Sequence, residues 1–481
     1  MLSVAGRAGT GALQLLTTVA LARLLVPEDF GLVAIVFALG SFAPVLIDLG
    51  LTDATIQKEH ITPSEVSSLF WITLSLSLVV ALGFVLLGPL MASVYGQPRL
   101  SQIAQTVAVS FLFYGASVQH IALLRRAMRF SDIAVIEIIA YFAGAGVAVV
   151  MALLGSGYWA LVARSLVTAV CLAGGTWIRC NWRPGLPSFN AEALSMVKFG
   201  FHVTGYSLSH FVTRAVDRAG LGLFYSPATV GIYQNALLLY ENAIHALMFP
   251  LHTVGISALS KLRQDTEALK RAYVRALSNV AFYAMPAFVV LAVAARDLVP
   301  LILGDKWIQA GGILSILALR GVVHTIESSQ GWLHLALGQP RRWMQWGFLT
   351  ALVQVIAVGL ALPFGAAGVA VAYVLAGAIL TLPSVIYAAQ PLKMGYRTLL
   401  DAVGRQLLGA AVALIAGSCI AFTLAESMPA LLRILTSASV CILAYAAIVI
   451  GIFQFTDPLR LLFQVGRRAI PMRSYARRTN V

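Results

Sequence analysis

Residues 344–392 read MQWGFLTALVQVIAVGLALPFGAAGVAVAYVLAGAILTLPSVIYAAQPL and contain no charged side chain. A helix that crosses a bilayer needs about 20 apolar residues, so this run is long enough for two spans. Residues 66–98, 406–425 and 434–456 form further uncharged runs. The runs are apolar on all sides and do not alternate in polarity as the strands of a membrane barrel do. They therefore predict a polytopic α-helical membrane protein.

The composition of the whole chain supports the same fold class. Of 481 residues, 59% are hydrophobic and 11% are charged, and the mean hydropathy is +0.87. These values exclude water-soluble globular and disordered proteins. Four cysteines, Cys171, Cys180, Cys419 and Cys441, are far apart in the sequence and show no CxxC spacing. They indicate neither a disulfide framework nor a metal site.

The apolar runs and the loop residues between them predict about fourteen transmembrane helices. The predicted helices are 4–26, 30–51, 67–93, 103–124, 133–154, 157–178, 197–225, 228–257, 275–303, 308–337, 343–363, 366–389, 403–424 and 431–454. The first of them has no basic residues ahead of it and no small-residue cleavage site, so we expect it to be retained. We divide the chain into an N-terminal six-helix lobe (1–190), a C-terminal six-helix lobe (191–395), an additional helix pair (396–456) and a basic cytoplasmic tail (457–481).

The net charge of +14 is spread over short loops. With a cytoplasmic N-terminus, the outer loops hold only Arg23, Arg99, Lys306 and Arg433, whereas the other loops and the tail are rich in arginine and lysine. This bias predicts that both termini lie in the cytoplasm. Basic residues placed in this way set topology and attract anionic lipid headgroups, so no nucleic-acid partner is expected.

A weak internal repeat relates the two predicted lobes. LLVPEDFGLVAI (24–35) and FYSPATVGIYQN (224–235) both place a proline, three residues and a glycine at a corner between helices. Pro27 and Gly31 thus correspond to Pro227 and Gly231. Repeated bundles around a site at the bilayer midplane are common in secondary transporters.

The predicted seventh helix carries a stripe of polar residues at spacings of four, on one helical face. The stripe contains His202, Tyr206, His210, Arg214 and Arg218, and Asp217 lies beside it. Ionisable groups are costly inside a bilayer, so such a stripe indicates a polar cavity or pairing between helices. The alternative to a cavity lining is local packing, in which Asp217 neutralises one arginine.

Other helices add further polar positions. They are Arg320, His324, Glu327 and His334 on the tenth helix; Gln234, Glu241, His245 and His252 on the eighth; and Arg7, Gln14, Thr18, Glu137, Tyr141 and Arg164 in the first lobe. Together they predict a central cavity with net positive charge. Because arginine binds phosphate oxygens through a bidentate fork, a pyrophosphate group is the favoured passenger.

Two sets of candidate site residues follow. The predicted substrate-binding residues are Arg214, Arg218, Arg320, Arg164, Tyr206 and His210. The predicted ion-coupling residues, which would carry a proton or respond to sodium, are Asp217, Glu327, Glu241 and His324. No cofactor is expected. The chain has no glycine-rich phosphate loop, no HExxH and no nucleophile elbow, so we do not expect an enzyme.

Two segments also resemble a known family. Residues 21–57, LARLLVPEDFGLVAIVFALGSFAPVLIDLGLTDATIQ, are similar to the opening helices of the Wzx-type flippases. These are the polysaccharide transporters of the multidrug/oligosaccharidyl-lipid/polysaccharide exporter superfamily. Asp217, Leu221, Gly222 and the corner Gly231-Ile-Tyr233 resemble the second-lobe motif of the same family. The resemblance covers essentially the whole chain and implies alternating access and an undecaprenyl-pyrophosphate-linked oligosaccharide as substrate.

In that reading the protein serves the biosynthesis of exopolysaccharide, capsule or lipopolysaccharide O-antigen. Membrane lipids, a polysaccharide polymerase and a chain-length regulator are the further predicted partners. Two alternatives stay open: a multidrug or cation exporter of the same superfamily, and a membrane polysaccharide polymerase or ligase. An exporter of cations would favour acidic residues in its cavity, and a polymerase or ligase usually has a large loop outside the membrane.

Overall fold

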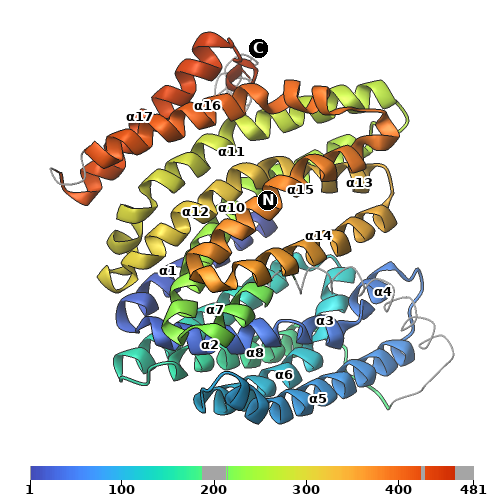
Figure 1. Ribbon diagram of the computed structural model, residues 1–481. Helices are drawn as coiled ribbons and strands as arrows, with labels where there is room; N and C mark the ends of the chain where they lie inside the picture. The colour runs from blue at the N-terminus through green and yellow to red at the C-terminus, as the bar shows by residue number, and fades with distance from the viewer. Residues whose placement is uncertain (1, 187–212, 214, 424–427, 461–481) are drawn as a thin grey trace, which may run out of the picture. The chain divides into compact units, whose positions relative to one another are not determined.

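The computed structural model describes residues 2–186, 213, 215–423 and 428–460, and the regular elements among them are helices (Figure 1). The first of these are α1 (Leu2–Leu24), α2 (Pro27–Gly40), α3 (Ala43–Asp48), α4 (Leu51–Gln57), α5 (Pro63–Val94), α6 (Arg99–Arg126), α7 (Phe130–Leu153) and α8 (Trp159–Arg179). Residues 215–224 are helical. The remaining α-helices are α10 (Pro227–Ser260), α11 (Thr266–Leu303), α12 (Ile308–Glu327), α13 (Ser329–Ala336), α14 (Pro340–Ala361), α15 (Gly365–Ala389), α16 (Tyr396–Thr423) and α17 (Ala430–Ala446).

Ten helical segments among the described residues are long and apolar enough to cross a membrane. Several contain two consecutive helices, as in the segment 341–392, which includes most of α14 and all of α15. The prediction of an all-α polytopic membrane protein is thereby confirmed. Most of the predicted seventh helix, 197–225, lies outside the described residues.

The predicted second helix, 30–51, is wrong as a single helix. The chain forms α2, α3 and α4 here and continues in helical form to Gln57. Pro44 lies in the first turn of α3, where its missing N–H is tolerated, whereas inside a continuous helix it would remove a hydrogen bond. Leu49 and Gly50 then adopt left-handed backbone conformations, with φ of 43° and 69°, which end α3 and start α4. The helix breaks are therefore local features of the sequence.

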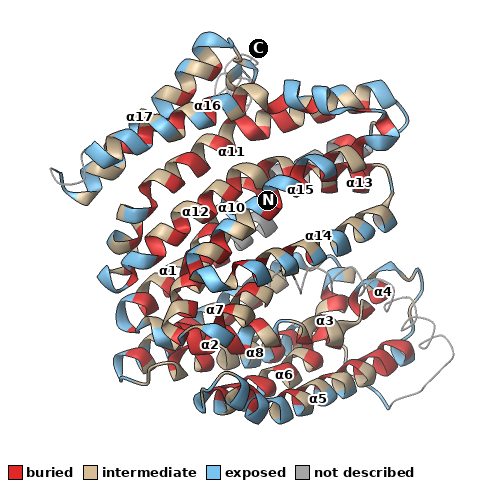
Figure 2. Cartoon of the chain, in the orientation of Figure 1, coloured by how far each residue is buried: buried red, intermediate tan, exposed pale blue. Residues whose placement is uncertain are grey.

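Exposed apolar side chains cover one face of α5. Val79, Leu82, Leu86 and Leu90 follow one another at spacings of three or four, and Leu86 is 77% exposed. Figure 2 shows exposed residues along the outer side of this helix and buried ones along the inner side. Such a continuous apolar surface is unfavourable in water, but it is the surface that lipid tails require. The protein is therefore a multi-pass membrane protein.

The chain packs as two compact units, each described here by itself. Unit 1 contains Met1–Ala246, Ala295–Leu317 and Pro340–Leu380, and unit 2 contains Leu247–Ala294, Ala318–Gln339 and Thr381–Val481. In unit 1, α5 packs on α6, α7 on α8, and α1 on α7. In unit 2, α16 packs on α17. The predicted lobes, helix pair and tail stay predictions.

Within unit 1, α2 and α10 cross at their first turns with almost no space between them. A Cβ atom added to Gly31 would overlap the carbonyl oxygen of Pro227, and one added to Gly231 would overlap that of Pro27. The two contacts are reciprocal, so the repeated Pro-x3-Gly sequence forms a two-fold-like contact between the two parts of the repeat. Only glycine allows backbones to approach this closely.

Polar contacts reinforce unit 1 beyond this crossing. Arg23, near the end of α1, donates to the carbonyl oxygens of Leu301 and Ile302 at 2.7 and 2.9 Å. The indole N–H of Trp307, in the short 3₁₀-helix Asp305–Trp307, donates to the carbonyl of Ala22 at 2.8 Å. Carbonyl groups at helix ends lack intrahelical partners, so these side chains satisfy groups that are costly to leave unpaired in a membrane.

Candidate functional site

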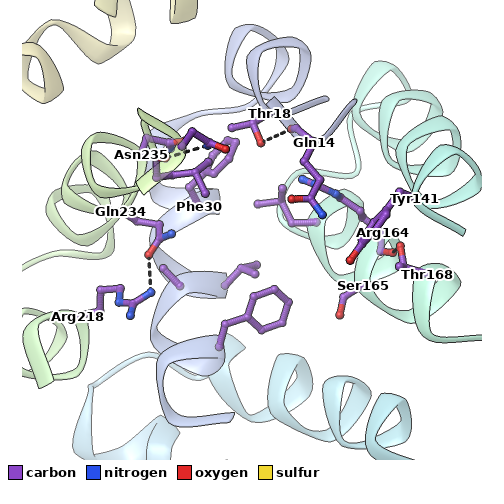
Figure 3. A pocket seen from close by; sticks show the side chains of 16 residues that line it. Gln14, Thr18, Phe30, Tyr141, Arg164, Ser165, Thr168, Arg218, Gln234 and Asn235 are labelled. Atoms are coloured by element: carbon purple, nitrogen blue, oxygen red, sulfur yellow. Dashed lines mark hydrogen bonds between the residues drawn. The ribbon is translucent and has the colours of Figure 1, made fainter. Parts of the chain in front are cut away.

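A cavity of about 410 Å³ lies within unit 1. Its volume falls in the range of roughly 300–1,000 Å³ that is typical of small-molecule sites. The lining residues come from α1, α2, α7, α8, α10 and the helical residues 215–224 (Figure 3). They are Gln14, Thr18, Phe30, Val33, Ala34, Phe37, Tyr141, Leu161, Arg164, Ser165, Thr168, Arg218, Gln234, Asn235, Leu238 and Asn242. Among them only Arg164 and Arg218 are charged.

Arg164 belongs to the wall that α1, α7 and α8 form. Figure 3 shows it on the same side of the cavity as Tyr141, Ser165 and Thr168. The Thr168 hydroxyl donates to the carbonyl of Arg164 at 2.7 Å, which binds two successive turns of α8 together. Gly144 allows α7 to approach this point, because a Cβ there would overlap the Thr168 hydroxyl. Close packing of α7 on α8 therefore sets the position of Arg164.

The charge of Arg164 has no carboxylate partner within ion-pair distance among the described residues. Glu137, one turn before Tyr141 on α7, forms no ion pair with Arg164. Arg164 is only partly exposed. Arginine is charged at every accessible pH, so one that lines a cavity without a described carboxylate partner favours the binding of an anion.

The opposite wall carries Arg218, whose charge is compensated. Its backbone N–H and its Nε donate to Asp217 Oδ1 at 2.7 and 3.4 Å. Its Nη1 donates to Gln234 Oε1 at 3.1 Å. The Tyr233 hydroxyl donates to the other oxygen of Asp217 at 3.0 Å, and Asp217 is 3% exposed. Asp217 therefore pairs with Arg218, as the sequence analysis considered, and Arg218 also lines the cavity.

Amide side chains from α10 complete this second wall, and two phenylalanines from α2 also line the cavity. Gln234, Asn235 and Asn242 come from α10, and Phe30 and Phe37 come from α2. The amide nitrogens of the two asparagines donate to backbone carbonyls one turn earlier, at 3.3 Å for Asn235 and 2.8 Å for Asn242. An amide group can both donate and accept hydrogen bonds, as the hydroxyl groups of a sugar require.

Three predicted site residues form a separate cluster, in unit 2. Arg320 Nη2 pairs with Glu327, and His324 Nδ1 lies 3.6 Å from the same carboxylate. Arg320 and Glu327 are 7% and 8% exposed. The predicted tenth helix, 308–337, is wrong as a single helix, because α12 ends at Glu327 and His334 lies on α13. The remaining three residues lie on α12, where Arg320 and Glu327 form a buried ion pair. The roles proposed for these residues stay predictions.

The remaining predicted residues are not in the cavity lining or lie outside the described residues. Glu241 is half-buried on α10 and is not among the lining residues. Arg214, Tyr206 and His210 lie outside the described residues. Of the predicted substrate-binding residues, the structure therefore brings together Arg164 and Arg218, which come from different parts of the chain.

The sequence analysis missed Asn235, Asn242, Ser165, Thr168 and the two phenylalanines. Helical spacing in the sequence could have identified some of these residues. Asn235 and Asn242 are seven residues apart and share a helical face, and Ser165 and Thr168 lie within one turn of Arg164. The phenylalanines lie in an apolar helix that is otherwise indistinguishable from a lipid-facing one, so their role needed the tertiary structure.

Solved structures of known proteins share this fold. The lipid II flippase MurJ in an inward closed conformation matches with a TM-score of 0.74 and 15% identity, over 94% of this chain and 99% of that one. An inward-facing multidrug resistance MATE family transporter of the MOP superfamily matches with a TM-score of 0.64 and 15% identity, over 80% of this chain and 94% of that one. Both are helical membrane proteins, in agreement with the predicted fold class.

Curated relatives are similar in sequence. The succinoglycan biosynthesis transport protein ExoT of Rhizobium meliloti is 26% identical over 76% of this chain and 73% of its own length. The lipopolysaccharide biosynthesis protein WzxC of Escherichia coli is 28% identical over 66% of this chain and 65% of its own length. Among these proteins, ExoT is named as a transport protein and MurJ as a flippase. Both names describe transport, in agreement with the prediction that this chain is not an enzyme. The family model described as "Polysaccharide biosynthesis protein" matches residues 20–311, more than half of the sequence, and the chain belongs to that family.

Proposed function

We propose that this protein moves an undecaprenyl-pyrophosphate-linked oligosaccharide from the cytoplasmic to the periplasmic leaflet of a bacterial inner membrane. The observation that carries the proposal is the cavity in unit 1, where the charged lining residues are two arginines on opposite walls. Asp217 compensates only one of them. The described part of the lining therefore carries net positive charge, and it suits a passenger with an anionic group and a polar, uncharged part.

The transport names of the relatives agree with this passenger. ExoT is named for transport in succinoglycan biosynthesis, and MurJ is named as a flippase of lipid II. In our proposal the polar head enters the cavity while the lipid tail stays in the bilayer. The product would supply the synthesis of exopolysaccharide, capsule or O-antigen, with a polymerase and a chain-length regulator acting next.

Transport in one direction requires that the cavity bind the passenger no more tightly when it faces outward. We propose that a proton or a sodium ion provides this bias. Asp217, Glu327, Glu241 and His324 are the candidate groups. Asp217 and Glu327 each hold an arginine, so protonation of either carboxylate would release that arginine and change the charge around it.

The test is the location of labelled undecaprenyl-pyrophosphate oligosaccharide in a strain depleted of the protein. Our proposal expects intact, unpolymerised lipid-linked repeat units to accumulate in the cytoplasmic leaflet. Accumulation in the periplasmic leaflet would show that translocation continues without the protein. That result would reject the flippase and favour a polymerase or a ligase.

A further inference from the structure

We infer that the cavity is divided, so that the diphosphate binds at the Arg164 wall and the first sugars bind along the Arg218 wall. The inference rests on the proposed function and deepens it, because it assigns the two chemical parts of the passenger to different residues. The two arginines differ in their partners: Arg218 is paired with Asp217, and Arg164 forms no ion pair with a described carboxylate.

Arg164 is the arginine that is available to an anion. Its guanidinium forms no ion pair with a described carboxylate. A guanidinium in a water-poor site gains most from a ligand that neutralises it, and phosphate oxygens match its fork geometry. Ser165, on the same wall, adds a hydroxyl that forms no hydrogen bond with the described residues. The hydroxyl of Tyr141 and the amide of Gln14 also line this wall.

Arg218 is in a different electrostatic state. Asp217 accepts from its backbone N–H and from its Nε, and Gln234 accepts from its Nη1. The pair has no net charge, and a phosphate placed beside it would meet the negative charge of Asp217 at close range. In a medium of low dielectric constant that repulsion is strong. The paired arginine still has N–H groups to donate, which suits the oxygen atoms of a neutral ligand.

The residues around Arg218 have the chemistry of a carbohydrate site. The amides of Gln234, Asn235 and Asn242 offer donors and acceptors, and Phe30, which lies beside Gln234 and Asn235 in Figure 3, offers a flat apolar surface. Binding pockets combine an apolar lining with a few oriented polar groups in this way. The Arg164 wall has fewer amides, and its polar groups gather around one uncompensated charge. The two walls therefore differ both in charge and in hydrogen-bonding groups.

The experiment measures binding of undecaprenyl diphosphate without sugar to the purified full-length protein in lipid nanodiscs. We expect R164Q to weaken binding by roughly ten- to hundredfold, the usual effect of losing hydrogen bonds to a charged group. R164K should lose less, because lysine keeps the charge and loses the fork. The double variant D217N/R218Q, which removes the ion pair without leaving a lone buried charge, should lose much less than R164Q. Arg99 lies outside the cavity lining, so R99Q should bind as the wild type does.

The outcomes separate the inference from the proposed function. If the wild-type protein binds the diphosphate lipid but R164Q binds it equally well, the division of the cavity is refuted and the flippase proposal stands. A loss in D217N/R218Q that equals or exceeds the loss in R164Q also refutes the division. If the wild-type protein does not bind the diphosphate lipid, the assignment of the diphosphate to the Arg164 wall is refuted, whereas the proposed function is decided separately by the leaflet in which the lipid-linked repeat units accumulate. Gel filtration and the unfolding midpoint of each variant show whether a loss of binding reflects a loss of fold.

Discussion

Replacing Gly31 with alanine should destabilise the protein by separating α2 from α10. The added Cβ would overlap the carbonyl oxygen of Pro227 and would lie 3.0 Å from the backbone nitrogen of Gly231. Both obstacles are backbone atoms, so no change of rotamer can relieve the contact. Two helices must move apart instead, and the neighbouring packing moves with them.

The magnitude follows from two opposing effects. Overpacking of a tight contact costs about 1–3 kcal/mol, and a backbone obstacle places Gly31 near the upper end. Alanine gains about 1 kcal/mol over glycine inside a helix. The expected net loss is therefore about 2 kcal/mol in the free energy of unfolding. G231A meets the carbonyl of Pro27 in the same way, and the double variant should lose less than the sum because one separation relieves both contacts.

The assay is SDS-induced unfolding of the purified protein in mixed micelles, followed by tryptophan fluorescence. G83A is the matched control, because Gly83 lies inside α5 with no other atom within 4 Å of the added Cβ. It should be as stable as the wild type or more stable by up to about 1 kcal/mol. If G31A proves as stable as G83A, the close crossing of α2 and α10 is refuted.

Three further variants test other contacts through the same unfolding midpoint. G144A should lower the free energy of unfolding by about 1–3 kcal/mol, because the added Cβ would overlap a side chain of α8. G146A is its control, because Gly146 lies on the same helix with open space around the added Cβ. Equal stability of the two variants would contradict the close packing of α7 on α8. E327Q should cost about 3–5 kcal/mol, because it breaks a buried ion pair with Arg320; a loss below about 1 kcal/mol, typical of exposed pairs, would show that the pair is not buried. W307F removes the indole N–H that donates to α1 and leaves a void at a fully buried position. It should therefore cost more than the hydrogen bond alone, which contributes about 0.5–1.5 kcal/mol, and an unchanged midpoint would contradict this contact.

The membrane-spanning helices could be predicted from the sequence because their cause is local. A bilayer requires about 20 apolar residues in a row and satisfied backbone groups, and both requirements act along the chain. Residues 344–392 meet them without reference to any other segment. The helix breaks at Pro44 and Gly50 are also local, and the sequence analysis overlooked Pro44 as a reason for a break within the span.

The partners of the charged residues depended on the tertiary structure. The sequence placed Asp217 next to Arg218 and left open whether the two side chains pair. In the structure Asp217 and Gln234 hold Arg218, whereas Arg164 has no described carboxylate partner. The same holds for Gly31, whose repeat with Gly231 was visible in sequence while their reciprocal contact was not. Apolarity can be read one segment at a time, whereas a cavity and its charge arise where distant helices meet. The sequence by itself determined that this chain spans the membrane, and packing decided which of the two described cavity arginines is paired with a carboxylate.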